Sequence, residues 1–125
     1  MDQGRVSSTS IILMSLLCML VFHSNMSFAE EHIVGDGKGW SFGVQNWPAG
    51  KTFKAGDTLV FNYSPTSHNV VVVNKSGYDS CVAPKGSKVY TSGADRITLA
   101  KGGNYFLCGF PGHCNLGQKI AVNAN

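Results

Sequence analysis

The chain contains 125 residues, of which 43% are hydrophobic, and it carries a formal net charge of +3. This length suits one domain, and the charge is too mild and too evenly spread for nucleic-acid binding, which needs a basic patch with interleaved aromatic residues. The positive balance favours acidic partners such as pectin-like polymers or negatively charged redox proteins, unless it serves solubility alone.

The first 29 residues have the pattern of a secretory signal peptide. Arg5 provides a positive start, Ile11 to Phe22 is a mostly apolar run of about a dozen residues, and Ser27-Phe28-Ala29 supplies small residues at the cleavage positions. We expect cleavage after Ala29, which leaves a secreted domain, residues 30–125, in the extracellular space or cell wall. The alternative is an uncleaved signal anchor, but the run is shorter than the roughly 20 residues of a membrane span. Because no second hydrophobic segment follows, we expect no membrane anchor in the mature chain.

Short segments with β-strand patterns follow the leader, separated by turns rich in Gly and Pro. Regularly spaced strands of this kind predict an all-β fold, a β-sandwich with Greek-key connections. Helical periodicity is weak, with one or two short helical turns expected between Ser76 and Ser87. The expected strands are His32–Val34, Thr58–Tyr63, His68–Asn74, Val89–Thr91, Arg96–Leu99 and Gln118–Asn123, and the VVVV run in the third is apolar on both faces, as in a strand covered on both sides.

The glycine-rich segment GDGKGW ends the first strand and reads as a turn. It could be mistaken for a nucleotide-binding loop, but no helical pattern follows and the spacing of the third glycine is wrong. Trp40, the last residue of this segment, and the following Phe42 and Trp47 are expected to be core and lid aromatics, some of which could shield a metal ion.

An odd number of cysteines remains once the signal peptide is removed. Cys18 leaves with the leader, so the mature chain holds Cys81, Cys108 and Cys114. An oxidising compartment favours one disulfide and leaves one thiol over. Spacing alone permits three pairings and does not decide which thiol is free. A metal-bound thiolate would give the extra cysteine a role; the alternatives are a buried inert thiol or a disulfide between two molecules.

Three side chains that can donate to a metal recur at intervals of five within NYFLCGFPGHCNLGQKIAV: Cys108, His113 and Gln118. A loop held between two strands can direct all three towards one small object, and thiolate with imidazole suits a soft or borderline transition metal. With His68, at the head of the most β-prone run, the set becomes two His and one Cys with a weak axial donor. That set is typical of a blue-copper electron-transfer site. Zinc is a chemical alternative, and a lone histidine is more often an ordinary surface or core residue.

The motifs SHNVVVVN, YDSC, KVYTSGADRITL and YFLCGFPGHC resemble those of the phytocyanins, a family of plant cupredoxins. The resemblance extends from about His32 to Asn125, nearly the whole mature chain. It implies the cupredoxin version of the sandwich and one type 1 copper ion. The copper ligands that it implies are His68, Cys108, His113 and Gln118.

The same resemblance implies further roles for individual residues. It pairs Cys81 with Cys114 in a disulfide, makes Asn69 a brace for the ligand loop, and makes His113 the port through which electrons pass. The function that it implies is outer-sphere one-electron transfer without enzymatic activity. We expect a monomer whose redox partner, a protein or a small extracellular molecule, is not readable from the sequence.

One ligand position departs from the plantacyanin branch of the family, which the chain otherwise resembles most. Plantacyanins carry an axial Met there, whereas this chain has Gln118, and its four Met residues all precede residue 30. Gln at this position looks like the stellacyanin branch. Because an amide oxygen is a harder donor than a thioether sulfur, we expect a lower reduction potential than in a Met-ligated relative. The alternative is that Gln118 points to water and leaves three ligands.

A second function class is a cell-wall or cell-surface interaction or signalling protein that uses the cupredoxin sandwich as a scaffold. Fold and site do not name a partner, so this class stays open. The presence of His68, Cys108 and His113 nevertheless favours the copper protein.

Two sequons offer candidate glycosylation sites. Asn62 lies within an expected strand and its Ser64 precedes Pro65, which makes it a poor acceptor. Asn74, at a strand end and followed by Ser76, is the better candidate.

Overall fold

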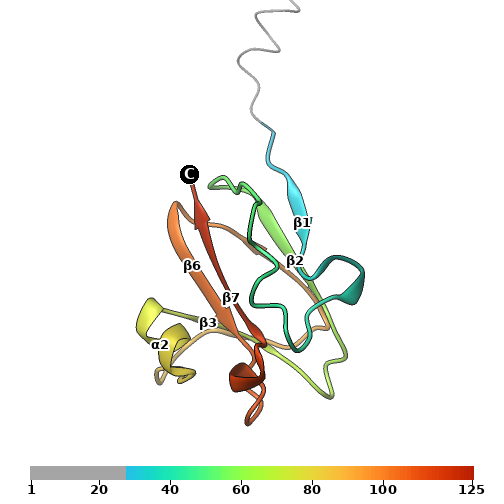
Figure 1. The fold of residues 1–125 in the computed structure, drawn as a ribbon, viewed down its shortest axis with the longest axis vertical. Coiled ribbons are helices and arrows are strands. Elements are labelled where there is room, and N and C mark those ends of the chain that lie inside the picture. Colours follow the sequence, from blue (N-terminus) through green and yellow to red (C-terminus); the bar gives the residue numbers. More distant parts are fainter. Residues whose placement is uncertain (1–27) are drawn as a thin grey trace, which may run out of the picture.

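Two β-sheets share one hydrophobic core in residues 28–125, which are the residues that the computed structural model describes (Figure 1). The all-β class predicted from the sequence is confirmed. Only β1 and β2 pair in parallel among the named strands of this range; the other pairs are antiparallel. The three-stranded sheet has the order β1 (Glu31–Ile33), β2 (Thr58–Asn62) and β5 (Ala94–Thr98), and the four-stranded sheet has the order β4 (Val89–Tyr90), β3 (Val70–Val73), β6 (Gly102–Leu107) and β7 (Lys119–Ala124).

Three short helical segments complete the described part of the chain: α2 (Lys75–Ser80), η1 (Asp36–Lys38) and η2 (Cys114–Leu116). The α2 helix matches the expected helical turn, and it begins where the Asn74 side chain accepts a hydrogen bond from Gly77 N at 2.8 Å. Between residues 28 and 125, none of these helices has the length and apolar character that a bilayer-spanning segment needs. The predicted signal peptide and Cys18 lie outside the described residues, apart from Phe28 and Ala29.

The β3 strand begins at Val70, two residues later than the predicted start at His68. The reason is that the two preceding residues are engaged by other parts of the chain. His68 N donates to Ser64 O at 3.0 Å, which closes a turn, and Asn69 O accepts a hydrogen bond from Trp40 Nε1 at 2.8 Å. His68 therefore stands at the end of the sheet, free to point away from it.

The four valines of β3 confirm that this strand is covered on both faces. Val70 belongs to the core between the sheets, with Val72 packed against it, whereas Val71 and Val73 belong to a second cluster on the outer face of the four-stranded sheet. The α2 helix contacts β3 and β6 over this outer face. An apolar run without alternation is thus explained by one strand that contributes to two cores.

Aromatic rings join the two sheets. Trp40, only 1% exposed, packs edge to face against Phe61 of β2 with ring centroids 5.0 Å apart. Phe61 in turn packs against Phe106 of β6 at 5.2 Å. The core is therefore densest between the middle strands of the two sheets, below the start of β3.

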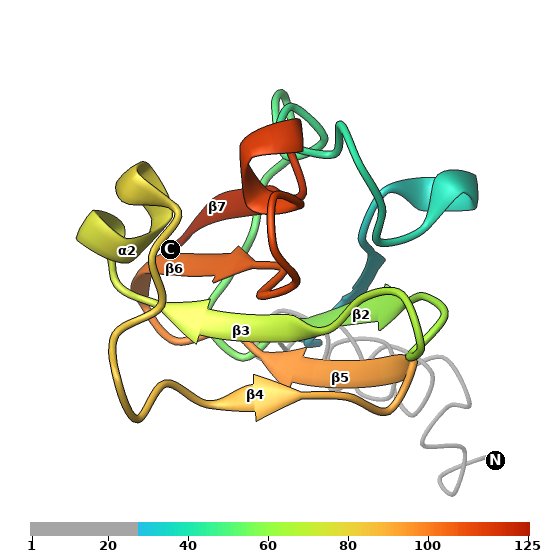
Figure 2. The same ribbon diagram turned by 90° about the horizontal axis from the view of Figure 1, so that it is seen from below.

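A disulfide joins Cys81, at the end of α2, to Cys114 in η2, which confirms the predicted pairing. Cys108 is the free cysteine of the described residues, and it is buried. Figure 2 shows α2 and η2 on the same side of β3, where this bond joins them. The disulfide thus ties the connection between β6 and β7 to the outer layer of the fold.

We predict that replacing Cys81 and Cys114 together by Ser lowers the free energy of unfolding by about 4 kcal/mol, because the bond closes a long loop in the unfolded chain. The measurement is urea denaturation of both proteins at neutral pH. The parent protein, once its disulfide has been reduced, should fall to the stability of the double variant. Equal stability of the parent and the double variant would contradict the prediction.

Candidate metal centre

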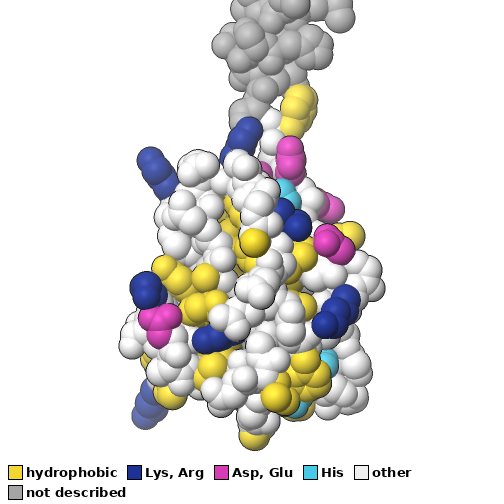
Figure 3. Space-filling view, viewed as in Figure 1, with side chains coloured by type: hydrophobic (Ala, Val, Ile, Leu, Met, Phe, Trp, Pro, Cys, Tyr) yellow, Lys and Arg dark blue, Asp and Glu magenta, His cyan; other side chains and the backbone are white. Residues whose placement is uncertain are grey.

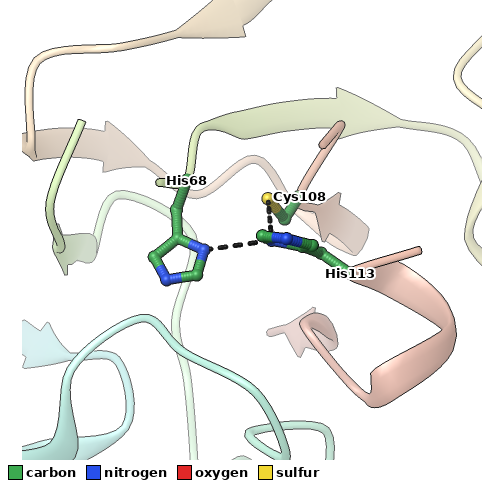
Figure 4. Close-up of side chains that lie close together, drawn as sticks. All are labelled: His68, Cys108 and His113. Carbon is green, nitrogen blue, oxygen red and sulfur yellow. Dashed lines mark hydrogen bonds between the residues drawn. The ribbon is translucent and has the colours of Figure 1, made fainter. Parts of the chain in front are cut away.

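Three side chains from distant parts of the sequence meet at one end of the sandwich (Figure 4). His68 Nδ1 lies 3.2 Å from His113 Nδ1, and Cys108 Sγ lies 3.6 Å from the same His113 nitrogen. All three donor atoms lie within 4.8 Å of one another. These are the three residues that the sequence predicts as strong metal ligands, and the fold brings them together.

Two of the three come from one segment, residues 108–118, which we call the ligand loop. Cys108 directly follows β6, and its N–H donates to Gln118 O at 3.0 Å, which closes the loop at its base. Gln118 N donates in turn to His113 O at 3.1 Å. The loop can fold so tightly because Gly112 and Gly117 take left-handed backbone angles, with φ of 80° and 84°, on either side of η2.

The protein environment of His68 favours the neutral ring, which is the form that binds metal. The His68 and His113 rings are both half-buried. Burial and the neighbouring His113 ring lower the pKa of His68 below its ordinary value, whereas the Gln118 side chain acts in the opposite direction. Unprotonated imidazole nitrogens facing each other across 3.2 Å present lone pairs that a cation can share.

The spacing of the donor atoms fits one transition-metal ion. Nitrogen and sulfur donors lie about 2.0–2.3 Å from such an ion, so three of them spread around it in a plane lie about 3.5–3.8 Å apart. The observed separations of 3.2 and 3.6 Å are close to this range. The donor set of two imidazoles and one thiolate therefore needs only small adjustments to close around a metal.

Gln118, the last residue of the ligand loop, has 0% of its surface exposed. Its Nε2 donates a long hydrogen bond of 3.4 Å to Trp40 O, while its Oε1 is buried without a hydrogen-bond partner. A buried carbonyl oxygen without a partner is costly in a folded protein. The amide is thus available as a weak oxygen donor, and it does not point to water.

Asn69, next to His68, connects the two halves of the site. Its Oδ1 accepts a hydrogen bond from Gly109 N at 2.6 Å, and Gly109 follows Cys108 directly. Its backbone oxygen accepts the Trp40 indole hydrogen bond at 2.8 Å. One asparagine thus holds the chain beside His68 and the chain beside Cys108 at a fixed separation.

Aromatic and apolar residues surround the outer side of the two histidines. The Phe42 ring lies 5.4 Å from the His68 ring and 4.7 Å from the His113 ring, between centroids, and Phe110 lies 5.6 Å from His113. Phe42 and Leu116 are 40% and 64% exposed. Figure 3 shows histidine atoms at the surface beside hydrophobic side chains, at the end of the molecule opposite β1. Phe42 was predicted only as a core or lid aromatic, and the structure shows that it contacts both histidine rings. The sequence pattern did not identify Phe110 as a neighbour of His113.

Other candidate residues lie away from this centre. His32, considered unremarkable in the sequence, contacts Asp57 at the other end of the sandwich. Asn74, the better glycosylation candidate, is exposed and caps α2 through its Oδ1, so its glycosylation stays a prediction. Trp47 is a partly buried core aromatic with Lys51 over its ring, and it does not shield the donor set.

The sequence and the fold are both similar to those of known copper proteins. Residues 40–118 match a family model described as a plastocyanin-like domain. A chemocyanin from Lilium longiflorum is 54% identical over 125 residues, which cover 99% of each chain. The solved structure of cucumber basic protein, a blue copper protein, is similar with a TM-score of 0.75 and 58% identity, over 76% of this chain and 99% of that one. Cucumber stellacyanin with Cu²⁺ is similar with a TM-score of 0.69 and 36% identity, over 78% of this chain and 96% of that one.

We predict that Asn69→Ala loosens the site, because Gly109 N loses its acceptor. The free energy of unfolding should fall by about 1 kcal/mol, and the affinity for a bound metal should fall roughly tenfold, as is typical when a residue behind a ligand is removed. Urea denaturation and competition with a chelator measure the two quantities. Asn115→Ala, an exposed asparagine of the ligand loop, serves as the matched control and should change neither.

Proposed function

Because this chain belongs to the phytocyanins, plant blue copper proteins with a plastocyanin-like domain, we propose that it carries single electrons between partner molecules by means of one type 1 copper ion. The observation that carries the proposal is the convergence of His68, Cys108 and His113 within 4.8 Å. This cluster fits one copper ion, and the similar blue copper proteins favour copper over zinc.

His68 and His113 would hold the metal through their Nδ1 atoms and Cys108 through its thiolate. Copper, when bound, supplies a one-electron change between Cu(II) and Cu(I). The protein's contribution is to keep the donors in place, because the ligand loop and Asn69 fix them through backbone hydrogen bonds of 2.6 to 3.1 Å. Little rearrangement is then required when the oxidation state changes, which favours fast outer-sphere transfer.

Gln118 would supply the weak axial oxygen. Two features support this role: the side chain is fully buried, and among the described residues its Oε1 has no hydrogen-bond partner. Such an oxygen stabilises the more highly charged Cu(II) state. We therefore propose a lower reduction potential than a Met in the same position would give.

His113 would serve as the electron port. Its ring is half-buried and lies between the Phe42 and Phe110 rings, at a surface that also carries the exposed side chains of Pro111 and Leu116. An apolar rim of this kind can approach a partner closely without a large desolvation penalty for charged groups. With four protein groups around the metal, no position is left for a substrate, so we propose a carrier and not an enzyme.

The proposed setting is the extracellular space. Cleavage after Ala29 would release residues 30–125 as a secreted domain, and the leader pattern in the sequence supports this. The mild positive charge favours a negatively charged redox partner or an acidic wall polymer. Which partner donates and which accepts the electron follows from neither the fold nor the site.

We predict that the purified secreted protein turns blue on addition of Cu(II), with an intense visible band from thiolate to copper. Cys108→Ser should abolish the band, because the serine oxygen cannot replace the sulfur, and Zn(II) should bind without colour because it has no redox change. Visible absorption spectroscopy with a copper titration measures both effects. A protein that binds no copper and stays colourless would refute the electron-transfer function and leave the scaffold function as the better hypothesis.

We predict that Gln118→Met raises the reduction potential by roughly 60 mV or more, which corresponds to a tenfold change in the preference for Cu(I) over Cu(II). Spectroscopic redox titration of the copper-loaded proteins gives the shift. Gln45→Met, at an exposed position, is the matched control and should leave the potential unchanged. An unchanged or lower potential in Gln118→Met would rule out the axial role.

A further inference from the structure

Asp57 forms a second polar centre, at the end of the sandwich where β1 begins. Its carboxylate is only 2% exposed, yet it is the target of three hydrogen bonds. Oδ1 accepts from Glu30 N at 3.0 Å, and Oδ2 accepts from Lys54 N at 3.0 Å and lies 3.0 Å from His32 Nε2. Burial raises the pKa of Asp57, but the hydrogen bonds from these residues outweigh it and lower the pKa to about 2. The carboxylate is therefore ionised at neutral pH.

The first of these donors has a special position in the sequence. Glu30 is the residue that follows the predicted cleavage site, so its backbone nitrogen is an amide in the precursor and an α-ammonium in the processed chain. We propose that Asp57 receives this new N-terminus, and that processing converts the hydrogen bond between the Glu30 amide and the Asp57 carboxylate into a partly buried ion pair that holds β1 in the sheet. The proposal rests on the processing step proposed above and is independent of copper binding.

The backbone around Glu30 holds the terminal nitrogen in place without help from the leader. Glu30 O accepts a hydrogen bond from Thr58 N at 2.9 Å, and the parallel pairing of β1 with β2 continues from Glu31 opposite Thr58. Phe28 and Ala29 are both exposed and make no part of the core. Removal of the residues before Glu30 therefore leaves its nitrogen facing Asp57, with no contact of the sheet lost.

The charges around this point favour the pair. The other titratable groups nearby are His32, which shares the carboxylate, Lys54, whose backbone N–H binds it, and Glu31, whose charge is paired with Arg96. Since Asp57 is shielded from water, its attraction for an ammonium group is screened less than it would be at an open surface. The hydrogen bond to the ionised carboxylate is already present in the precursor, and only the processed chain adds the attraction between two opposite charges.

The test uses the full chain with its leader, expressed in a secreting host, so that the cell performs the processing. Intact-mass measurement of the secreted protein should identify Glu30 as the first residue. Inserting one Gly between Ala29 and Glu30 keeps the small residues of the cleavage site but moves the ammonium one residue away, so Glu30 N becomes a neutral amide that still donates to Asp57. We expect the inserted variant to have a roughly fivefold to tenfold larger equilibrium constant of unfolding in urea at neutral pH.

Asp57→Asn in both backgrounds completes the comparison, with the exposed Asp36→Asn as the matched control. The asparagine should destabilise the parent more than the Gly-inserted chain. If Asp57→Asn does not fold, an NMR titration of the N-terminal α-ammonium tests the proposal without that variant. The pKa of this group should lie above the ordinary range of about 7.7–8.0 in the parent and within it after the insertion.

Two results would overturn the proposal. An N-terminus other than Glu30 would remove its premise, and equal stability with an ordinary α-ammonium pKa in both proteins would show that Asp57 does not receive the charge. The copper-dependent blue band, recorded on the same samples, separates this outcome from a failure of the electron-transfer function, because Asp57 lies at the opposite end of the fold from the donor set.

Discussion

The site depends on the closure of the ligand loop at its base. The hydrogen bonds from Cys108 N to Gln118 O and from Gln118 N to His113 O, at 3.0 and 3.1 Å, tie these three residues into one unit. The disulfide at Cys114 anchors that unit to the end of α2 from the outside. Because these contacts involve only the protein, the donors are positioned before any metal arrives. A site prepared in this way resists the geometric changes that different oxidation states would otherwise impose, which is what an electron carrier requires.

His68 reaches the same unit from another strand, and the hydrophobic core determines where it lies. Trp40 packs against Phe61 in the centre of the sandwich, and its indole N–H holds the backbone of Asn69. The side chain of Asn69 then holds Gly109 of the ligand loop. The packing of the Trp40 ring in the core therefore helps to set the distance between the His68 and His113 imidazoles. A substitution that shifts the Trp40 ring should disturb the site as well as the stability, because the indole N–H binds the backbone of Asn69 and not a donor atom.

Much of the fold and of the donor set could be predicted from the sequence, because it follows from the spacing of nearby residues and from the number of cysteines. Strand spacing predicted the β-sandwich, and an odd cysteine with regularly spaced donors predicted Cys108 as a metal ligand. Local patterns could not show that β3 begins at Val70, because Trp40, distant in the sequence, binds the residue before it. The same limit applies to Phe42, which reaches both histidines across long sequence separations. It also applies to Asp57, whose partners Glu30 and His32 precede it by 27 and 25 positions. Counting cysteines also left the disulfide pairing open, and the family resemblance assigned it to Cys81 and Cys114, as the fold confirms.

The buried polar groups of the described chain separate structural from functional roles. Asp57 accepts from three donors, and Asp95 accepts from the backbone and the hydroxyl of Ser92, so these carboxylates are satisfied within the protein. Gln118 differs, because its Oε1 is buried without a partner. The Trp47 indole nitrogen is also without one, but it is a donor and cannot bind a cation. Gln118 closes the loop that carries Cys108 and His113, and the proposed axial role would give its buried oxygen a partner. This unsatisfied buried oxygen is therefore the physical argument that supports the axial role proposed for Gln118.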